Sequence, residues 1–390
     1  MKSTFFKGFA IAGLIAVGGL VLAGEGRAQE IKLGQTMPYS GTGSAWATIG
    51  RAHGAYFDML NAKGGINGHK VKLISLDDSY SPPKTVEQTR KLVEQEQILA
   101  IFGSLGTGGL VATKEYLVGK GVPQLFLSIG SDIWGTPEAR KLGTLFAPLR
   151  HTETDAYARY IMAKRPNAVI GVLSQNDDFG RELVKALKIS LKDKASQIVK
   201  EVTYEATDAT VDSQIIALKS AGVDTFVNFA NPKFSIQAIR KASDIQWKPE
   251  HILFSFSALI DGVFKPAGLD KSTGIVTATY MKDPKDPIWA NDTGVKDYLD
   301  FMKTYYPSGD PNGMMNAMGY TAAQMVTQAL LRAGNDLSRE NIAKQAKSIP
   351  EMQLPMILPG IKFGTKADSL TGLNDMKLQR FDGTRWVLMD

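Results

Sequence analysis

Hydroxyl groups and glycines gather in three loops of the first half of the chain. The first loop holds Tyr39, Ser40 and Trp46, the second runs over residues 103–109, and the third over residues 128–131. Free backbone amides and hydroxyls at the start of a helix attract a carboxylate or another small anion. Each loop alone reads as an ordinary turn, because turns use Gly and Ser. Three such loops together favour a binding site for a small acid.

The elements that must position these loops are short apolar strands. Strands are predicted at 31–36, 71–76, 98–102 and 124–127, separated by amphipathic helical segments. Strands that alternate with helices form parallel sheets, and ligands bind beyond the carboxyl ends of such strands. The three loops each follow a predicted strand, so we expect them to meet at one edge of one sheet.

The same alternation restarts after Arg150, which predicts a second unit built like the first. Strands are expected at 168–173, 198–204, 225–229, 252–254 and 275–279, with helices between them. Helices near 295–304, 315–332 and 339–347 follow. The tail differs: residues 360–363 and 376–389 read as short strands or a hairpin, with Asp382-Gly383 as its turn.

Patterns required for other kinds of chemistry are missing. The 103–109 loop lacks the Lys of a phosphate loop and does not match Gly-x-Gly-x-x-Gly. There is no cysteine, and none of the four histidines has metal-ligand spacing. The pairs Asp77-Asp78 and Asp177-Asp178 follow strands, where capping is their more frequent role, and no nucleophile has a base beside it. We expect no enzyme, no metal and no cofactor.

The N-terminal 28 residues have the layout of a secretory signal peptide. Two lysines precede an apolar run from Phe9 to Ala23, and small residues lead to Ala28. At about 15 residues the run is shorter than the roughly 20 that a spanning helix needs, although an uncleaved anchor is the alternative. The formal net charge of +6 is spread among interspersed acids and bases, which argues against a nucleic-acid groove. We expect a periplasmic protein that begins at Gln29.

Five segments together resemble the branched-chain amino-acid-binding type of periplasmic substrate-binding protein. They are Tyr39-Ser40-Gly41, residues 61–70 with the specific pattern Asn-x-x-Gly-Gly-Ile-Asn-Gly, Asp77-Asp78, the 103–109 loop, and residues 176–180. The similarity covers essentially the whole mature chain. It implies the type I periplasmic binding fold: α/β, with two Rossmann-like lobes whose parallel-core sheets are joined by a three-crossover hinge that closes on the ligand.

The resemblance divides the chain and names its partners. Residues 1–28 are the signal peptide, residues 29–149 with 278–354 form the N-terminal lobe, and residues 150–277 with 355–390 form the C-terminal lobe. We expect a monomer that binds a small-molecule carboxylate and serves the permease subunits of an ABC importer in the inner membrane. An alternative of another class is a ligand-sensing receptor on the same fold.

The resemblance also places ligand contacts on both lobes. Thr107 matches the hydroxyl position that binds the ligand carboxylate, and Phe179 stands where the family has Tyr, which keeps an aromatic wall. The full candidate set is Tyr39, Ser40, Trp46, Leu105, Thr107, Gly108, Ile129, Gly130, Ser131, Phe179, Phe229, Asn231, Phe256 and Ser257.

One departure from the family bears on the ligand. Amino-acid binders present a Glu after the strand that ends near Phe254, whereas this chain reads Ser255-Phe256-Ser257-Ala258, and the preceding family Tyr or Asp is altered to Phe229-Ala230-Asn231. Without that carboxylate an α-ammonium would be buried unpaired, at a cost of several kcal/mol. Phe179 and Phe256 suit an aromatic body. We expect an aromatic acid of the benzoate or cinnamate type, with a branched-chain or other amino acid as the alternative.

Overall fold

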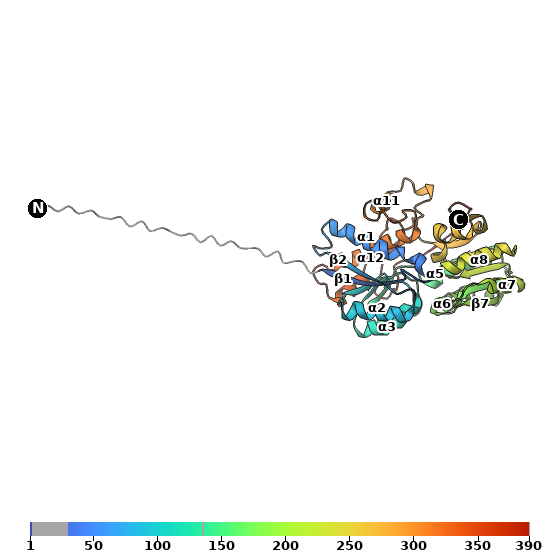
Figure 1. The fold of residues 1–390 in the computed structure, drawn as a ribbon, viewed down its shortest axis with the longest axis horizontal. Coiled ribbons are helices and arrows are strands. Elements are labelled where there is room, and N and C mark those ends of the chain that lie inside the picture. Colours follow the sequence, from blue (N-terminus) through green and yellow to red (C-terminus); the bar gives the residue numbers. More distant parts are fainter. Residues whose placement is uncertain (2–29, 135, 390) are drawn as a thin grey trace.

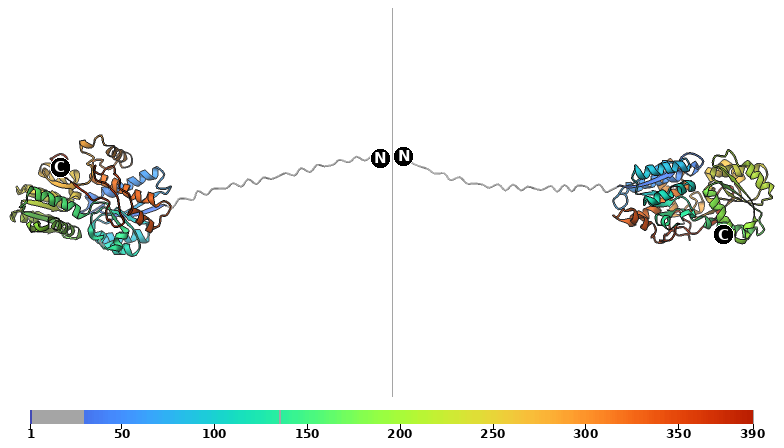
Figure 2. Two further views of the ribbon diagram at one scale, coloured as in Figure 1. Left: turned by 180° about the vertical axis from the view of Figure 1, so that it is seen from behind. Right: turned by 90° about the horizontal axis from the view of Figure 1, so that it is seen from below.

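Two α/β lobes lie side by side in the computed structural model, which describes residues 1, 30–134 and 136–389 (Figure 1). Figure 2 shows the same two-lobed arrangement from behind and from below. The predicted signal peptide lies outside the described residues. Within them, no helix combines the length and the apolar character that crossing a membrane requires.

The first lobe is built on a five-stranded parallel sheet of order β2-β1-β3-β4-β5. Its strands are β1 (Ile31–Met37), β2 (Val71–Asp77), β3 (Ala100–Phe102), β4 (Gln124–Leu127) and β5 (Gly143–Leu145). Helix α1 (Thr48–Ala62) packs on α12 (Met314–Ala333), and α2 (Pro82–Glu94) packs on α3 (Thr107–Gly119). These two pairs cover opposite faces of the sheet (Figure 1). Helices α4 (Pro137–Leu142), α11 (Thr293–Tyr305) and α13 (Arg339–Ala346) complete this part.

The second lobe holds a seven-stranded sheet of order β12-β11-β10-β9-β8-β6-β7. Its strands are β6 (Ile170–Gln175), β7 (Ile198–Tyr204), β8 (Thr225–Phe229), β9 (Glu250–Leu253), β10 (Val276–Thr279), β11 (Lys377–Phe381) and β12 (Trp386–Leu388). The strands from β7 to β10 are parallel, and β11 and β12 add an antiparallel hairpin. Helix α5 (Arg150–Lys164) packs on α6 (Asp178–Leu191), and α7 (Asp212–Ser220) packs on α8 (Pro232–Asp244).

The α/β alternation and the tail hairpin are therefore confirmed, and a few short elements differ. The segment predicted as a strand at 360–363 makes only an isolated bridge between Phe363 and Met352. Residues 260–272 form short helical turns, and α4 and β5 were not predicted. Helical segments of three to six residues are too short to show the 3.6-residue period of a helix.

The segment that leads into the hairpin contacts the first lobe. The backbone amide of Leu145 in β5 donates to Leu370 O at 2.8 Å, and Thr371 bridges to Leu145. Leu370 and Leu373 are buried. The sequence assigns residues 355–376 to the second lobe, but these contacts tie them to the first sheet, and β11 joins the second sheet from Lys377. We therefore propose that the third crossover lies just before Lys377 and not at Leu354.

Candidate ligand-binding site

A small cavity lies between the lobes, and most of the large side chains around it are aromatic. Its volume is about 20 Å³, which is room for about one water molecule. We call it the aromatic cavity. It is lined by Trp46, Tyr80, Leu105, Gly106, Thr107, Ser128, Ile129, Arg150, Phe179, Phe254 and Phe256. Six of the predicted site residues are in this lining: Trp46, Leu105, Thr107, Ile129, Phe179 and Phe256.

The loop after β3 brings a hydroxyl and a helix start to the cavity. Gly106 has a φ of 112°, a backbone conformation that favours glycine, and α3 begins at the next residue. Thr107 is 2% exposed, and its Oγ1 has no hydrogen-bond partner. A buried hydroxyl without a partner is unfavourable, and the first amides of a helix also lack intrahelical partners. This corner of the cavity is therefore suited to an acceptor such as a carboxylate.

Arg150 also lines the cavity, and the sequence analysis did not include it in the site. Arg150 is the first residue of α5 and is 3% exposed. Its Cζ lies 5.2 Å from the ring centroids of both Phe179 and Phe254. Its Nε lies 4.0 Å from Oε2 of Glu182 and has no hydrogen-bond partner. A guanidinium between two rings is held by cation–π attraction and keeps donors for a ligand.

Two carboxylates share the surroundings of Arg150. Glu153 is buried and accepts hydrogen bonds from Tyr157 OH at 2.7 Å and from Ser255 N at 2.8 Å. Burial raises the pKa of Glu153 and also that of Glu182, while the positive charge of Arg150 lowers both. Neither carboxylate is in the lining of the aromatic cavity, so both lie near the charge of Arg150 without facing the cavity.

The aromatic wall comes from the first turn of α6 and from the segment that follows β9 in the second lobe. The rings of Phe254 and Phe256 are stacked with centroids 5.7 Å apart, and Phe179 meets Phe254 edge-on at 5.1 Å. Trp46 of the first lobe donates from Nε1 to Phe256 O at 2.8 Å, across the space between the lobes. Ser131 and the Asp132 amide likewise donate to Glu182. The lobes are thus in contact at Trp46 and at Glu182.

Three predicted residues of the second lobe lie outside the lining and support its loops. Phe229 is fully buried in the core. Asn231 caps α8, with Oδ1 accepting from Phe234 N, and its Nδ2 donates to Gln175. Ser257 Oγ donates to Ala230 O at 2.7 Å. Their polar atoms are used within the protein.

In the first lobe, the remaining predicted residues also make contacts within the protein. Tyr39 OH hydrogen-bonds with Ser75 Oγ at 2.6 Å, and Ser40 Oγ donates to Asp77. Gly130 lies so close to Pro148 that a Cβ would be 1.9 Å from the Pro148 carbonyl oxygen. The carbonyl of Gly130 accepts from Arg150 N at 2.8 Å, so this glycine fixes the arginine that lines the cavity.

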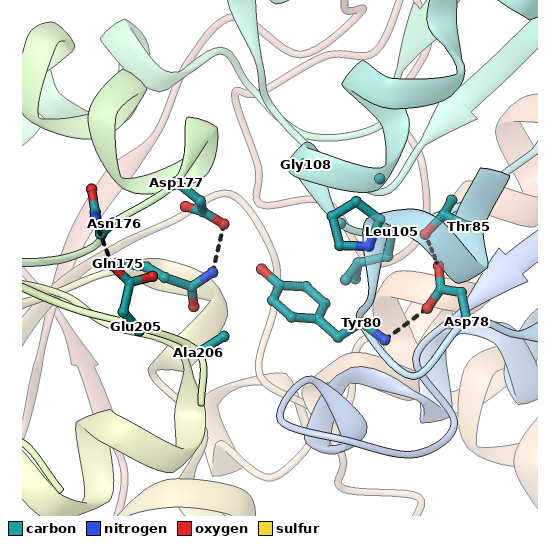
Figure 3. Close-up of a pocket in the computed structure, with 13 residues that line it drawn as sticks. Asp78, Tyr80, Thr85, Leu105, Gly108, Gln175, Asn176, Asp177, Glu205 and Ala206 are labelled. Carbon is teal, nitrogen blue, oxygen red and sulfur yellow. Dashed lines mark hydrogen bonds between the residues drawn. The ribbon is translucent and has the colours of Figure 1, made fainter. Parts of the chain in front are cut away.

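A second, polar cavity of about 160 Å³ adjoins the first (Figure 3). It is lined by Asp78, Tyr80, Pro82, Thr85, Leu105, Gly106, Gly108, Gly109, Gln175, Asn176, Asp177, Glu205 and Ala206. The acidic pairs act as predicted for caps: Asp177 accepts from Gly180 N at the start of α6, and Asp78 accepts from Tyr80 N and Thr85 Oγ1. Among the described residues, no three His, Cys, Asp or Glu side chains are grouped to hold a metal.

Comparison with known proteins identifies the family. Residues 30–384 match the profile of the family described as periplasmic binding protein, and the chain belongs to it. The Leu/Ile/Val-binding protein homolog 7 of Brucella abortus is 23% identical over 324 residues, 77% of each chain. The family and the type I fold predicted from the sequence are confirmed. Its members bind small molecules and work with ABC permeases; it is not an enzyme family.

Two solved structures illustrate the range of ligands in proteins of this fold. One is the solute-binding protein of an ABC transporter from R. palustris in complex with benzoate, with a TM-score of 0.79 at 18% identity over 93% of this chain and 96% of that one. The other is a branched-chain amino acid ABC transporter protein from Thermus thermophilus with bound valine, with a TM-score of 0.82 at 18% identity over the same shares of the two chains.

Proposed function

We propose that this protein is the periplasmic solute-binding component of an ABC importer and that it captures a small aromatic carboxylate of the benzoate or cinnamate type. The observation that carries the proposal is the buried guanidinium of Arg150, held between Phe179 and Phe254 in the wall of the cavity. The unpartnered hydroxyl of Thr107 reaches the same cavity from the other lobe.

Charge favours an anion in this site. Of the described residues that line the aromatic cavity, Arg150 alone carries a charged side chain. A ligand carboxylate would meet a positive charge and a hydroxyl donor in surroundings of low dielectric, where such pairs are strong. An α-ammonium would meet a cation and no carboxylate in this lining, so its burial would be unfavourable.

Shape favours an aromatic body. Trp46, Tyr80, Phe179, Phe254 and Phe256 surround the cavity, and aromatic pairs gain about 0.5 to 1.5 kcal/mol beyond the burial of their area. The benzoate complex from R. palustris supports this choice, since a protein of the same fold accepts such a ligand. The valine complex supports the alternative, an amino acid.

Capture requires the lobes to separate and close. A cavity of about 20 Å³ cannot hold a benzoate as it stands, and the hydrogen bond from Trp46 to Phe256 joins the two walls. Hinge motion about the crossovers would break this contact, admit the ligand and then re-form the enclosure around it.

Calorimetry on the mature protein tests the ligand class. Benzoate or phenylpropenoate should bind at least tenfold more tightly than leucine, because leucine carries the ammonium that the cavity leaves unpaired. Micromolar binding of leucine together with no heat from any aromatic acid would overturn the proposal.

The transport role has a separate test, because a ligand-sensing receptor would share the same site. Protein with bound acid should associate with the permease and ATPase subunits of its importer when these are placed in membrane vesicles, and should stimulate ATP hydrolysis. Binding of the acid without any such stimulation would favour the receptor.

A further inference from the structure

Tyr80 stands between the aromatic cavity and the polar cavity. It lines both, together with Leu105 and Gly106, and it is the largest side chain that the two linings share. Its ring packs against Trp46 with centroids 5.6 Å apart. Figure 3 shows its hydroxyl pointing away from the first lobe toward Gln175 and Asp177 of the second. The ring therefore closes one end of the aromatic cavity.

The two cavities differ in the chemistry they offer. The aromatic cavity contains Arg150 and the unpartnered Thr107 hydroxyl, both of which suit an anion. The polar cavity is lined by the carboxylates of Asp78, Asp177 and Glu205, and no Lys, Arg or His is among its described lining. A molecule that spans both would need a carboxylate at one end and a hydrogen-bond donor at the other.

We infer that Tyr80 determines the length of the ligand: it restricts the site to acids no longer than phenylpropenoate, with the shorter benzoate preferred, and a small side chain at this position would join the two cavities. With Tyr80 in place, the aromatic cavity ends at the phenol ring. Without the ring, a longer acid with a hydroxyl at the end opposite its carboxylate, such as 4-hydroxyphenylpropenoate, could reach the acceptors beyond. This inference rests on the proposed function and deepens it.

The backbone at Tyr80 dictates how the variants are chosen. Ser79 and Tyr80 have φ values of 52° and 59°, in the left-handed region, and Tyr80 N donates to Asp78 Oδ1 at 2.9 Å. Ala and Phe both carry a Cβ, so each experiences the same backbone conformation as Tyr. Tyr80→Ala removes the ring, whereas Tyr80→Phe removes only the hydroxyl, and the two form a matched pair.

The experiment measures by calorimetry how tightly benzoate and 4-hydroxyphenylpropenoate bind to the wild-type protein and to both variants, after thermal unfolding has checked that each is folded. The wild type should prefer benzoate by at least tenfold. Tyr80→Ala should shift that ratio toward the longer acid by at least tenfold, and Tyr80→Phe should keep the ratio within threefold. The acid with a second carboxylate in place of the hydroxyl should gain nothing from Tyr80→Ala.

The outcomes separate the two proposals. If benzoate binds but the ratio is the same in Tyr80→Ala, or if the wild type prefers the longer acid, Tyr80 does not limit length and the proposed ligand class stands. If neither acid binds to the wild type or to the folded variants, the ligand class is wrong and the inference is overturned with it.

Discussion

The two lobes contribute different kinds of side chain to the walls of the cleft. The first lobe contributes the hydroxyl of Thr107 at the amino end of a helix, beside separate aromatic side chains such as Trp46 and Tyr80. The second lobe contributes a stack of rings, Phe179, Phe254 and Phe256, and Arg150 lies against the first two of these. The neutral hydroxyl donor therefore lies on the first lobe, whereas the second lobe combines a continuous stack of rings with a cation.

This difference suggests a division of labour between the lobes. Hydrogen bonds from the first lobe would fix the acid group, because donors at a helix start are directional and already oriented. The rings of the second lobe would cover the body, where area counts more than direction. Arg150 stands at the junction of the two, since it follows the first crossover and begins α5.

Removing the charge at this junction should have the largest effect. Arg150→Met takes away the cation of the cavity, so we expect binding of benzoate to weaken by roughly 30-fold or more, which corresponds to about 2 kcal/mol or above. Calorimetry measures the change. Arg159→Met, an exposed arginine on the same helix, is the matched control and should bind as the wild type does.

Arg150→Met also leaves Glu182 without its positive neighbour, which costs stability. Arg150→Lys keeps the charge without the planar fork, and it should bind less tightly than the wild type and more tightly than Arg150→Met. If folded Arg150→Met binds benzoate within threefold of the wild type, the charge of Arg150 does not contribute to binding, and the proposed role of the second lobe is wrong.

Removing the hydroxyl of the first wall should have the next largest effect. Loss of one hydrogen bond to a charged group costs roughly 1.5 to 3 kcal/mol, so Thr107→Ala should weaken binding by about 10 to 150 fold. Thr107→Ser keeps the hydroxyl and should bind close to the wild type in the same titration. If Thr107→Ala binds within twofold, this residue only starts the helix.

A smaller effect, on stability and not on binding, is expected at Asp78 in the loop that carries Tyr80. Burial raises the pKa of Asp78 from 3.8 to about 6, so the folded protein holds this proton more tightly than the unfolded chain. This group therefore adds to the free energy of unfolding below its unfolded pKa of 3.8, and the contribution is lost as pH rises through about 6. The free energy of unfolding should fall by about 1 kcal/mol between pH 5 and pH 7 for this reason.

Asp78→Asn should remove that part of the pH dependence. Urea unfolding at pH 5 and pH 7 compares the variant with the wild type, and other buried acids cancel because both proteins contain them. If the free energy of unfolding changes by the same amount between pH 5 and pH 7 in the two proteins, Asp78 is charged throughout this range and the loop is held in another way.

Much of the fold could be predicted because its signals are local and repeated. The alternation of apolar runs with amphipathic segments located β1 to β4 and β6 to β10 within about two residues, and proline and glycine marked several helix ends. The path of residues 355–376 could not be read this way, because it depends on long-range contacts such as the bridge from Thr371 to the edge strand β5.

The site was only partly predictable, for a similar reason. Loops that follow parallel strands located Leu105, Thr107, Ile129 and Phe256 at the cleft. Arg150 follows an apolar run, and the sequence marks it only as the boundary after which the α/β alternation restarts. Its burial between Phe179 and Phe254 depends on tertiary contacts, which the sequence does not show. The one sequence signal for this position was an arginine that follows an apolar stretch at a lobe boundary.

A crystal structure of the protein with benzoate tests the central claim most directly, because that claim is geometric. We predict a closed cleft in which the carboxylate lies within hydrogen-bonding distance of Thr107 Oγ1 and of the Arg150 guanidinium, with the ring among Phe179, Phe254 and Phe256. A benzoate whose carboxylate faces solvent or the polar cavity, away from Thr107 and Arg150, would contradict the account.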